Sequence, residues 1–473
     1  MTERFDKPDA GVPDDLLCFY SVDQLAAAYR SGALSPLTVA QAMFARIARV
    51  NPRLAAYYAL DEAGALQAAR AAESRHRAGT AKSALDGVPV AIKDHIDVAG
   101  MASPRGMSLT SASAASLATQ DSPVTARLRE AGALIMGKTT MPELSVIPVT
   151  HTRAFGITRN PCDTARSPGG SSGGGAAAAA AGLCTIAIGS DGGGSIRLPA
   201  SFTGIAGHKP TLGRVPYHPG QTDRTVAGPL ARSARDCAHA MNAIARADGR
   251  DWMELPADDT DYLAALAGAS LKGLRVAYSP DYGYQKVDAA VAALVDAAVE
   301  AMARAGATVT RIATVCRDPF RPYMIQAGLR LRASKRRDDD PPAVASMLDF
   351  AATITPEDLQ FLLDERNRLG ADLLGIFKSH EVLLSPTSPV VAPAVGEFYP
   401  DGDTLGEANR NLIGFTCPVN LVHMPAVSVH CGHAGGGLPV GLQFAGPKFS
   451  DARLLAVAAA FERLTENRAT AGT

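Results

Sequence analysis

The stretch from residue 169 to residue 210 restricts the fold of this chain more than any other segment. It reads GGSSGGGAAAAAAGLCTIAIGSDGGGSIRLPASFTGIAGHKP, so two serine-bearing glycine loops lie on either side of an alanine run and an apolar run. This order predicts a tightly packed helix over 176–181 and a buried strand over 183–189. Glycines at this density suit places where backbone lies close to backbone or to a ligand. A flexible linker would not contain apolar segments that must be buried, so the stretch indicates a serine-based catalytic site.

A second candidate lies upstream, where the apolar run 88–92 ends on Lys93. Burial at the end of a strand disfavours the charged ammonium group and lowers the pKa of a lysine. Lys93 is therefore a candidate general base. The alternative, a structural lysine whose amine reaches solvent, stays open on this ground alone.

Ser195 is the candidate nucleophile, because it follows Gly192, Gly193 and Gly194, whose amides no side chain obstructs. A serine nucleophile needs a base and donors for the oxyanion. No histidine lies in a sequence context that would identify it as the base for Ser195, so a lysine base fits better. The G-x-S-x-G pattern at 169–173 lacks the preceding strand that the nucleophile elbow of hydrolases requires.

The segment 132–139, GALIMGKT, matches the pattern of a phosphate-binding loop. Such a loop follows a strand, but residues 122–131 read as a capped helix and the apolar ALIM reads as the strand itself. Gly132 is then expected to end the helix and Lys138 to stand at a strand end. The context therefore argues against a nucleotide site.

The 473-residue chain has a net charge of −1 and 5% aromatic residues, which argues against nucleic acid as a partner. No apolar run reaches the roughly 18 residues that a membrane span needs, and the first 15 residues lack the apolar core of a secretion signal. We therefore expect a cytoplasmic protein. The seven cysteines form no C-x-x-C pair, and neither the histidines at 423, 430 and 433 nor His95 with Asp97 predict a metal, so no cofactor is expected.

The order strand, helix, strand over 274–278, 287–305 and 307–312 indicates an α/β sheet. Residues 417–429 and 437–444 are predicted as two further strands. We expect one domain over 18–465, between a polar tail at 1–17 and a tail at 466–473. Within it, core motifs lie at 85–236, a peripheral segment at about 247–380 and C-terminal core strands at 381–465.

Seven segments together resemble the amidase signature family from about residue 20 to residue 465. They are GVPVAIKD, SPGGSSGGGAAAAAAG, GSDGGGSIRLPA, GHKPT, GPLARSARD, FTCPVN and GLPVGLQFAG, in the order expected for the family. The serines at 171 and 195 also have the family's spacing. The resemblance implies a mixed central β-sheet sandwiched between α-helices. It implies no cofactor, a small-molecule amide as substrate and, from what is common in the family, a homodimer.

Carried over residue by residue, the resemblance implies a Ser-cisSer-Lys triad. Ser195 would be the nucleophile, Ser171 the proton relay and Lys93 the general base. The relay serine would be held by a cis peptide between Gly170 and Ser171. The resemblance also implies oxyanion donors at the amides from Gly192 to Ser195 (Gly192, Gly193, Gly194 and Ser195) and supporting roles for Ser172, Asp191 and Arg197.

The implied reaction is hydrolysis of a linear carboxylic amide to an acid plus ammonia or an amine through an acyl-serine, with esters as further substrates. The alternative is the glutaminase subunit of a tRNA-dependent amidotransferase, which also resembles this chain. Those subunits carry an aspartate where this chain has Ile413 and a glutamine where it has Leu198, and the loop with Ser190 and Gly192 departs from their commonest GTDTGGS. These departures favour a free-standing amidase for an uncharged or aryl/alkyl amide. Its pocket walls are expected from 101–120, 145–155 and 316–350.

Overall fold

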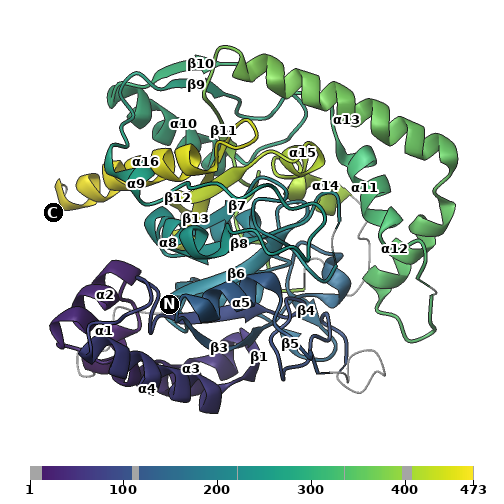
Figure 1. Cartoon of the computed structure of the whole chain (residues 1–473). Coiled ribbons are helices and arrows are strands. Elements are labelled where there is room, and N and C mark those ends of the chain that lie inside the picture. Colours follow the sequence, from purple (N-terminus) through teal and green to yellow (C-terminus); the bar gives the residue numbers. More distant parts are fainter. Residues whose placement is uncertain (1–12, 109–116, 221, 335, 397–406, 472–473) are drawn as a thin grey trace.

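The computed structural model describes residues 13–108, 117–220, 222–334, 336–396 and 407–471 (Figure 1). Within these residues, eleven strands form one mixed sheet in the order β1-β3-β2-β6-β8-β7-β12-β13-β11-β9-β10. The strands are β1 Tyr57–Leu60, β2 Pro89–Lys93, β3 Leu134–Thr139, β6 Ile186–Asp191, β7 Ala206–Lys209, β8 Val226–Ala231, β9 Arg275–Tyr278, β10 Thr308–Arg311, β11 Val382–Pro386, β12 Ala426–Ala434 and β13 Leu438–Ala445. A separate hairpin joins β4 His151–Thr152 and β5 Gly156–Ile157.

Helices cover both faces of the sheet (Figure 1). They are α1 Pro13–Leu17, α2 Val22–Ser31, α3 Pro36–Leu54, α4 Glu62–Arg77, α5 Pro123–Glu130, α6 Gly173–Ala180, α7 Arg197–Thr203, α8 Ala234–Ile244, α9 Ala264–Ala267, α10 Ala289–Arg304, α11 Phe320–Leu329, α12 Pro342–Thr353, α13 Pro356–Phe377, α14 Glu407–Ile413, α15 Cys417–Leu421 and α16 Asp451–Ala471, with short 3₁₀ turns η1 Glu143–Ser145 and η2 Gly435–Gly437. No helix in the described part of the chain is both long and apolar enough to cross a membrane.

The two faces of the sheet follow from the alternation of side chains along each strand. In β2, Val90 and Ile92 pack into a core with α2, α5, α8, α10 and α16. Ala91, between them, faces the opposite core with α3, α4 and α6. In β11, Leu383 likewise packs against α13 and α15. This confirms the predicted sheet between two helical layers.

Most of the elements predicted from the sequence lie where they are expected, and one does not. The helix and strand predicted at 176–181 and 183–189 overlap α6 and β6, and residues 89–92 of the apolar run form most of β2. The prediction of a strand over all of 417–429 is wrong, because α15 occupies its first third and β12 begins only at Ala426. Pro418 lies in the first turn of α15, where its fixed φ favours a helix and its missing N–H costs nothing.

Helices extend into both segments expected as tails, and the segment expected at the periphery adds strands to the edge of the sheet. Helix α1 lies within the segment 1–17, and α16 continues to Ala471 through most of the segment 466–473. The segment 247–380 contributes β9 and β10 to one edge of the sheet. Residues of its helices α11 and α12 lie around the same cavity as Gly193 and Ser195 of the loop that follows β6.

Candidate active site

Lys93 occupies the last position of β2, between the parallel neighbours β3 and β6. Its side chain is fully buried. Its Nζ lies 2.8 Å from Ser171 Oγ, 2.8 Å from Ser172 Oγ and 3.0 Å from Ser190 Oγ. Strand β2 therefore delivers one amine to three hydroxyl groups.

The charge on Lys93 is controlled by its burial. Loss of hydration lowers the pKa of Lys93 to about 7, although Asp191 and Asp94 act in the opposite direction. The Arg330 charge lowers this pKa further. At slightly alkaline pH the amine is mostly neutral, and it can then accept a proton from a hydroxyl group that touches it.

The first glycine loop places Ser171 against this amine. The Gly170–Ser171 peptide bond is cis, as the resemblance implies. A Cβ on Gly170 would lie 2.7 Å from the Val149 amide nitrogen, so only glycine allows the loop to pack backbone to backbone here. Ser171 is 1% exposed.

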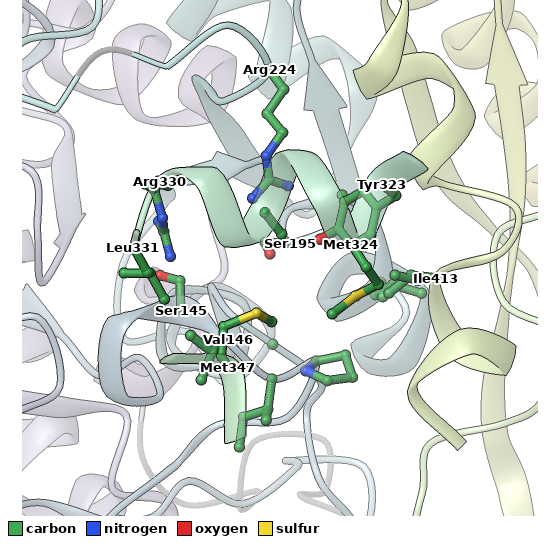
Figure 2. A pocket seen from close by; sticks show the side chains of 16 residues that line it. Ser145, Val146, Ser195, Arg224, Tyr323, Met324, Arg330, Leu331, Met347 and Ile413 are labelled. Carbon is green, nitrogen blue, oxygen red and sulfur yellow. The ribbon is translucent and has the colours of Figure 1, made fainter. Parts of the chain in front are cut away.

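The second glycine loop follows β6 and presents Ser195. The Ser172 amide donates to the Ser195 carbonyl at 3.1 Å, which ties the two loops together. Within the described chain, the Ser195 hydroxyl makes no hydrogen bond to protein, and Figure 2 shows it facing the pocket. A hydroxyl held in this way is free to meet a substrate carbonyl.

Some backbone amides of this loop donate hydrogen bonds within the protein, and others are free to donate into the cavity. The Gly194 amide donates to Asp191 Oδ1 at 2.7 Å, and the Ile196 amide donates to Asp191 Oδ2 at 3.2 Å. The amides of Gly193 and Ser195 have no acceptor among the described residues, and both residues line the pocket. These two N–H groups can receive a developing oxyanion.

A buried ion pair supports the loop from behind. Arg197 donates two hydrogen bonds of 2.9 Å to Asp191, and both side chains are fully buried. Arg197 also donates to Gln443 at 2.7 Å and to Asn420 at 2.6 Å. Burial alone would raise the pKa of Asp191, but the Arg197 charge and hydrogen bonds hold it well below its usual range. The carboxylate thus stays ionised and fixes the loop.

Two neighbouring cavities share Ser195 as a wall residue. The smaller, of about 30 Å³, is walled largely by apolar side chains that include Leu198 and Ile413. The larger, of about 270 Å³, reaches Ser171. Their walls include Arg105, residues 145–148 and residues of α11 and α12. This confirms that the three segments expected to form pocket walls do contribute to them.

Several residues of the site carry no motif that sequence reasoning could use. Ser190 stands out in the sequence only as a departure from a family motif, yet its hydroxyl touches Lys93. Ile92 of β2 pairs with Ile188 of β6 in parallel register, so Ser190 lies beside the end of β2 that carries Lys93. Knowledge of this strand register would have been needed to predict the role of Ser190. Arg224 and Arg330 lie in segments with no recognisable pattern, and both line the two cavities.

The other sequence candidates have structural roles. Residues 134–139 form β3, and the buried Lys138 amine donates to the Ile96 carbonyl at 2.7 Å and to Ser103 Oγ at 2.9 Å. Lys138 therefore does not face a phosphate. Asp97 accepts a hydrogen bond from Ser103. In the described ranges, no group of three or more His, Cys, Asp or Glu side chains could hold a metal ion.

Comparison with known proteins gives matches along nearly the whole chain. The model of the family described as Amidase matches residues 38–339 and 342–455. The chain is 34% identical to the A-type subunit of the glutamyl-tRNA(Gln) amidotransferase from Myxococcus xanthus, over 93% of this chain and 96% of that protein. It superposes on 6-aminohexanoate cyclic dimer hydrolase with a TM-score of 0.86 and 26% identity, covering 94% of this chain and 97% of the other. It superposes on the peptide amidase from Stenotrophomonas maltophilia with a TM-score of 0.80 and 28% identity, covering 97% of this chain and 98% of the other.

Proposed function

The chain belongs to the amidase signature family, and we propose that it hydrolyses a carboxylic amide to an acid plus ammonia or an amine through an acyl-enzyme on Ser195. The observation that carries this proposal is the fully buried Lys93 amine at 2.8 Å from Ser171 Oγ, with its pKa lowered to about 7. A neutral lysine at this position can act as a general base without histidine.

In the proposed mechanism, neutral Lys93 takes the proton of Ser171 while Ser171 takes the proton of Ser195. The Ser195 oxygen attacks the carbonyl carbon, and the amides of Gly193 and Ser195 donate to the oxyanion. The Gly194 amide is already bound to Asp191, so it is not available to the oxyanion. Gly192, which lines the larger cavity, remains a proposed donor. The relay then returns a proton to the leaving nitrogen. Water, activated by the same relay, releases the acid and restores Ser195.

A glutaminase subunit is the second candidate, and the curated relatives with that name favour it. The cavity supports the first candidate. Among the described residues that line the two cavities, none is Asp or Glu, so no wall carboxylate would accept the α-ammonium group of glutamine. Leu198 and Ile413 make part of the wall apolar.

Release of ammonia or amine by the isolated chain distinguishes the two candidates. The assay compares simple aliphatic amides, anilides, a peptide amide, esters and glutamine. We expect turnover of one of the non-glutamine amides without any partner subunit or tRNA. Hydrolysis of glutamine alone, or only when partner subunits are added, would favour the glutaminase.

A further inference from the structure

Arg224 is an almost buried arginine beside Ser195 that has no carboxylate partner in the described chain. It is 6% exposed. One Nη donates to the Gly192 carbonyl, and its guanidinium carbon lies 4.9 Å from the centre of the Tyr323 ring. The neighbouring Asp223 is taken by Arg366 at 2.8 Å. A buried guanidinium is normally paired with an anion.

Arg330, directly after α11, is a second arginine that lacks a carboxylate partner in the described chain, and unlike Arg224 it is exposed to solvent. Its Nη2 donates to the Leu144 carbonyl at 2.6 Å. The protein around the guanidinium displaces water and lowers the pKa of Arg330 to about 10, and the charges of Arg224 and Arg105 lower it as well. The group is still cationic at neutral pH, so Arg224 and Arg330 place two positive charges on the cavity wall, and none of the described residues that line it is Asp or Glu.

The cavity collects these charges next to the nucleophile. Arg224 and Arg330 line both cavities, and Arg105 lines the larger one. Figure 2 shows Arg224 and Arg330 pointing into the pocket on two sides of Ser195. No Asp or Glu is among the described lining residues. Arg197, by contrast, lies behind the loop and is fully paired with Asp191.

We propose that the substrate carries an ionised carboxylate, which Arg224 and Arg330 bind while Ser195 attacks an amide in the same molecule. This inference rests on the proposed function and names the substrate class of that site. It replaces the uncharged or aryl/alkyl amide expected from the sequence. Guanidinium groups suit carboxylates because their N–H groups match the two oxygens. The cavity of about 270 Å³ is near the lower limit for ligand pockets, which fits a compact substrate.

The first test compares amides that differ by one carboxylate. Glutaramate is paired with pentanamide, for a carboxylate on the acyl side, and N-acetylglycine with N-ethylacetamide, for one on the amine side; in each pair a methyl group replaces the carboxylate. We expect kcat/KM to favour the carboxylate by about 10²-fold in at least one pair, since an unpaired buried charge is costly. The pair that shows the preference locates the carboxylate in the substrate. A preference for the neutral amide in both pairs would overturn the inference.

Variants then assign the preference to the arginines. Arg224→Met and Arg330→Met should each reduce the ratio of kcat/KM values by at least tenfold, with partial rescue in Arg330→Lys. Arg321→Met is the matched control, because Arg321 lies on α11, the helix that ends just before Arg330, but it is paired with Asp358 and does not line either cavity. It should keep the wild-type ratio. Loss of the ratio in Arg321→Met as well would contradict the assignment.

A binding measurement separates this inference from the proposed function. In the Ser195→Ala variant, glutarate should raise the melting temperature and 1,5-pentanediol should not. The shift caused by glutarate should disappear at high salt and in the double variant that also carries Arg224→Met. If glutarate binds in this way but no amide is hydrolysed, the proposed function fails and the carboxylate site stands. If glutarate gives no arginine-dependent shift, the carboxylate site is overturned whatever the amidase activity.

Discussion

Lys93 is the residue whose charge decides whether the site can work. It is fully buried and its pKa is lowered from 10.5 to about 7. The protonated amine cannot take a proton from Ser171, whereas the neutral amine can. Because the folded pKa lies below the unfolded value, the unfolded chain binds more protons between pH 7 and about 10.4. In this window the contribution of Lys93 to stability rises with pH.

The first prediction concerns pH. We expect kcat/KM to rise with pH below about 7 and to level off above it, because the neutral form of Lys93 is then reached. Lys93→Met should lose activity by about 10²- to 10⁴-fold at all pH values. Steady-state rates from pH 5 to 9 measure both. An apparent pKa near 10 in the wild type would contradict the neutral base.

The same variant gives an independent stability readout. Removing the buried amine removes the cost of burying its charge, which is largest below pH 7. The melting temperature of Lys93→Met relative to wild type should therefore increase as the pH falls from 9 to 6. A difference that does not change with pH would mean that Lys93 keeps its charge throughout.

Asp191 is the second residue for which the structure predicts a specific effect of substitution, in this case on stability. Asp191→Asn leaves Arg197 buried without its counter-ion and should lower the free energy of unfolding by about 3–5 kcal/mol. Glu300→Gln is the control, because the Glu300–Arg304 pair is exposed on α10 and should contribute about 0.5 kcal/mol or less. Urea unfolding of both variants gives the comparison. Equal effects would show that the buried pair does not stabilise the loop.

At the scale of elements, helix α6 sets the distance between the two serine loops. Its glycines and alanines have almost no side-chain bulk, and its first seven residues are buried. A Cβ on Gly174 would lie 2.5 Å from the Thr140 amide nitrogen and 2.6 Å from the Thr140 carbonyl oxygen. The small residues let the helix lie directly against the chain after β3, which keeps Ser171 at the end of β2.

Gly174→Ala should therefore destabilise the protein by about 1–3 kcal/mol through overpacking and reduce kcat. Gly375→Ala on α13 is the matched change, since nothing lies within 4 Å of its added Cβ. It should stabilise the protein by roughly 0.5–1 kcal/mol, because alanine is the better helix former. If both variants lose stability equally, close packing of α6 is not what requires glycine.

At the scale of the whole molecule, one sheet brings distant segments to one site. The end of β2 supplies Lys93 and the loop after β6 supplies Ser195, because β2 and β6 are parallel neighbours. Asn420 of α15 and Gln443 of β13 reach back to Arg197 from the C-terminal part. The expectation of a single domain over 18–465 stays a prediction, consistent with this continuous sheet.

The parts of the site that could be predicted from the sequence are those marked by a short local pattern of residues. Glycine density revealed both loops, and an apolar run ending on lysine revealed Lys93. The roles of Arg224 and Arg330 could not be predicted. They depend on which side chains the fold brings near these arginines, and on the lack of a carboxylate among the described residues that line the cavities. The strand predicted across 417–429 failed because an apolar run containing Pro418 suits a helix start as well as a strand.

The most direct test of the central claim is the site of acylation during turnover. The chain is mixed with an activated aryl ester, quenched in acid within the first turnovers, and analysed by intact and peptide mass. We predict one acyl group per chain, located on Ser195, and neither adduct nor amide turnover in Ser195→Ala. An acyl group on another residue, or normal turnover by Ser195→Ala, would contradict the account.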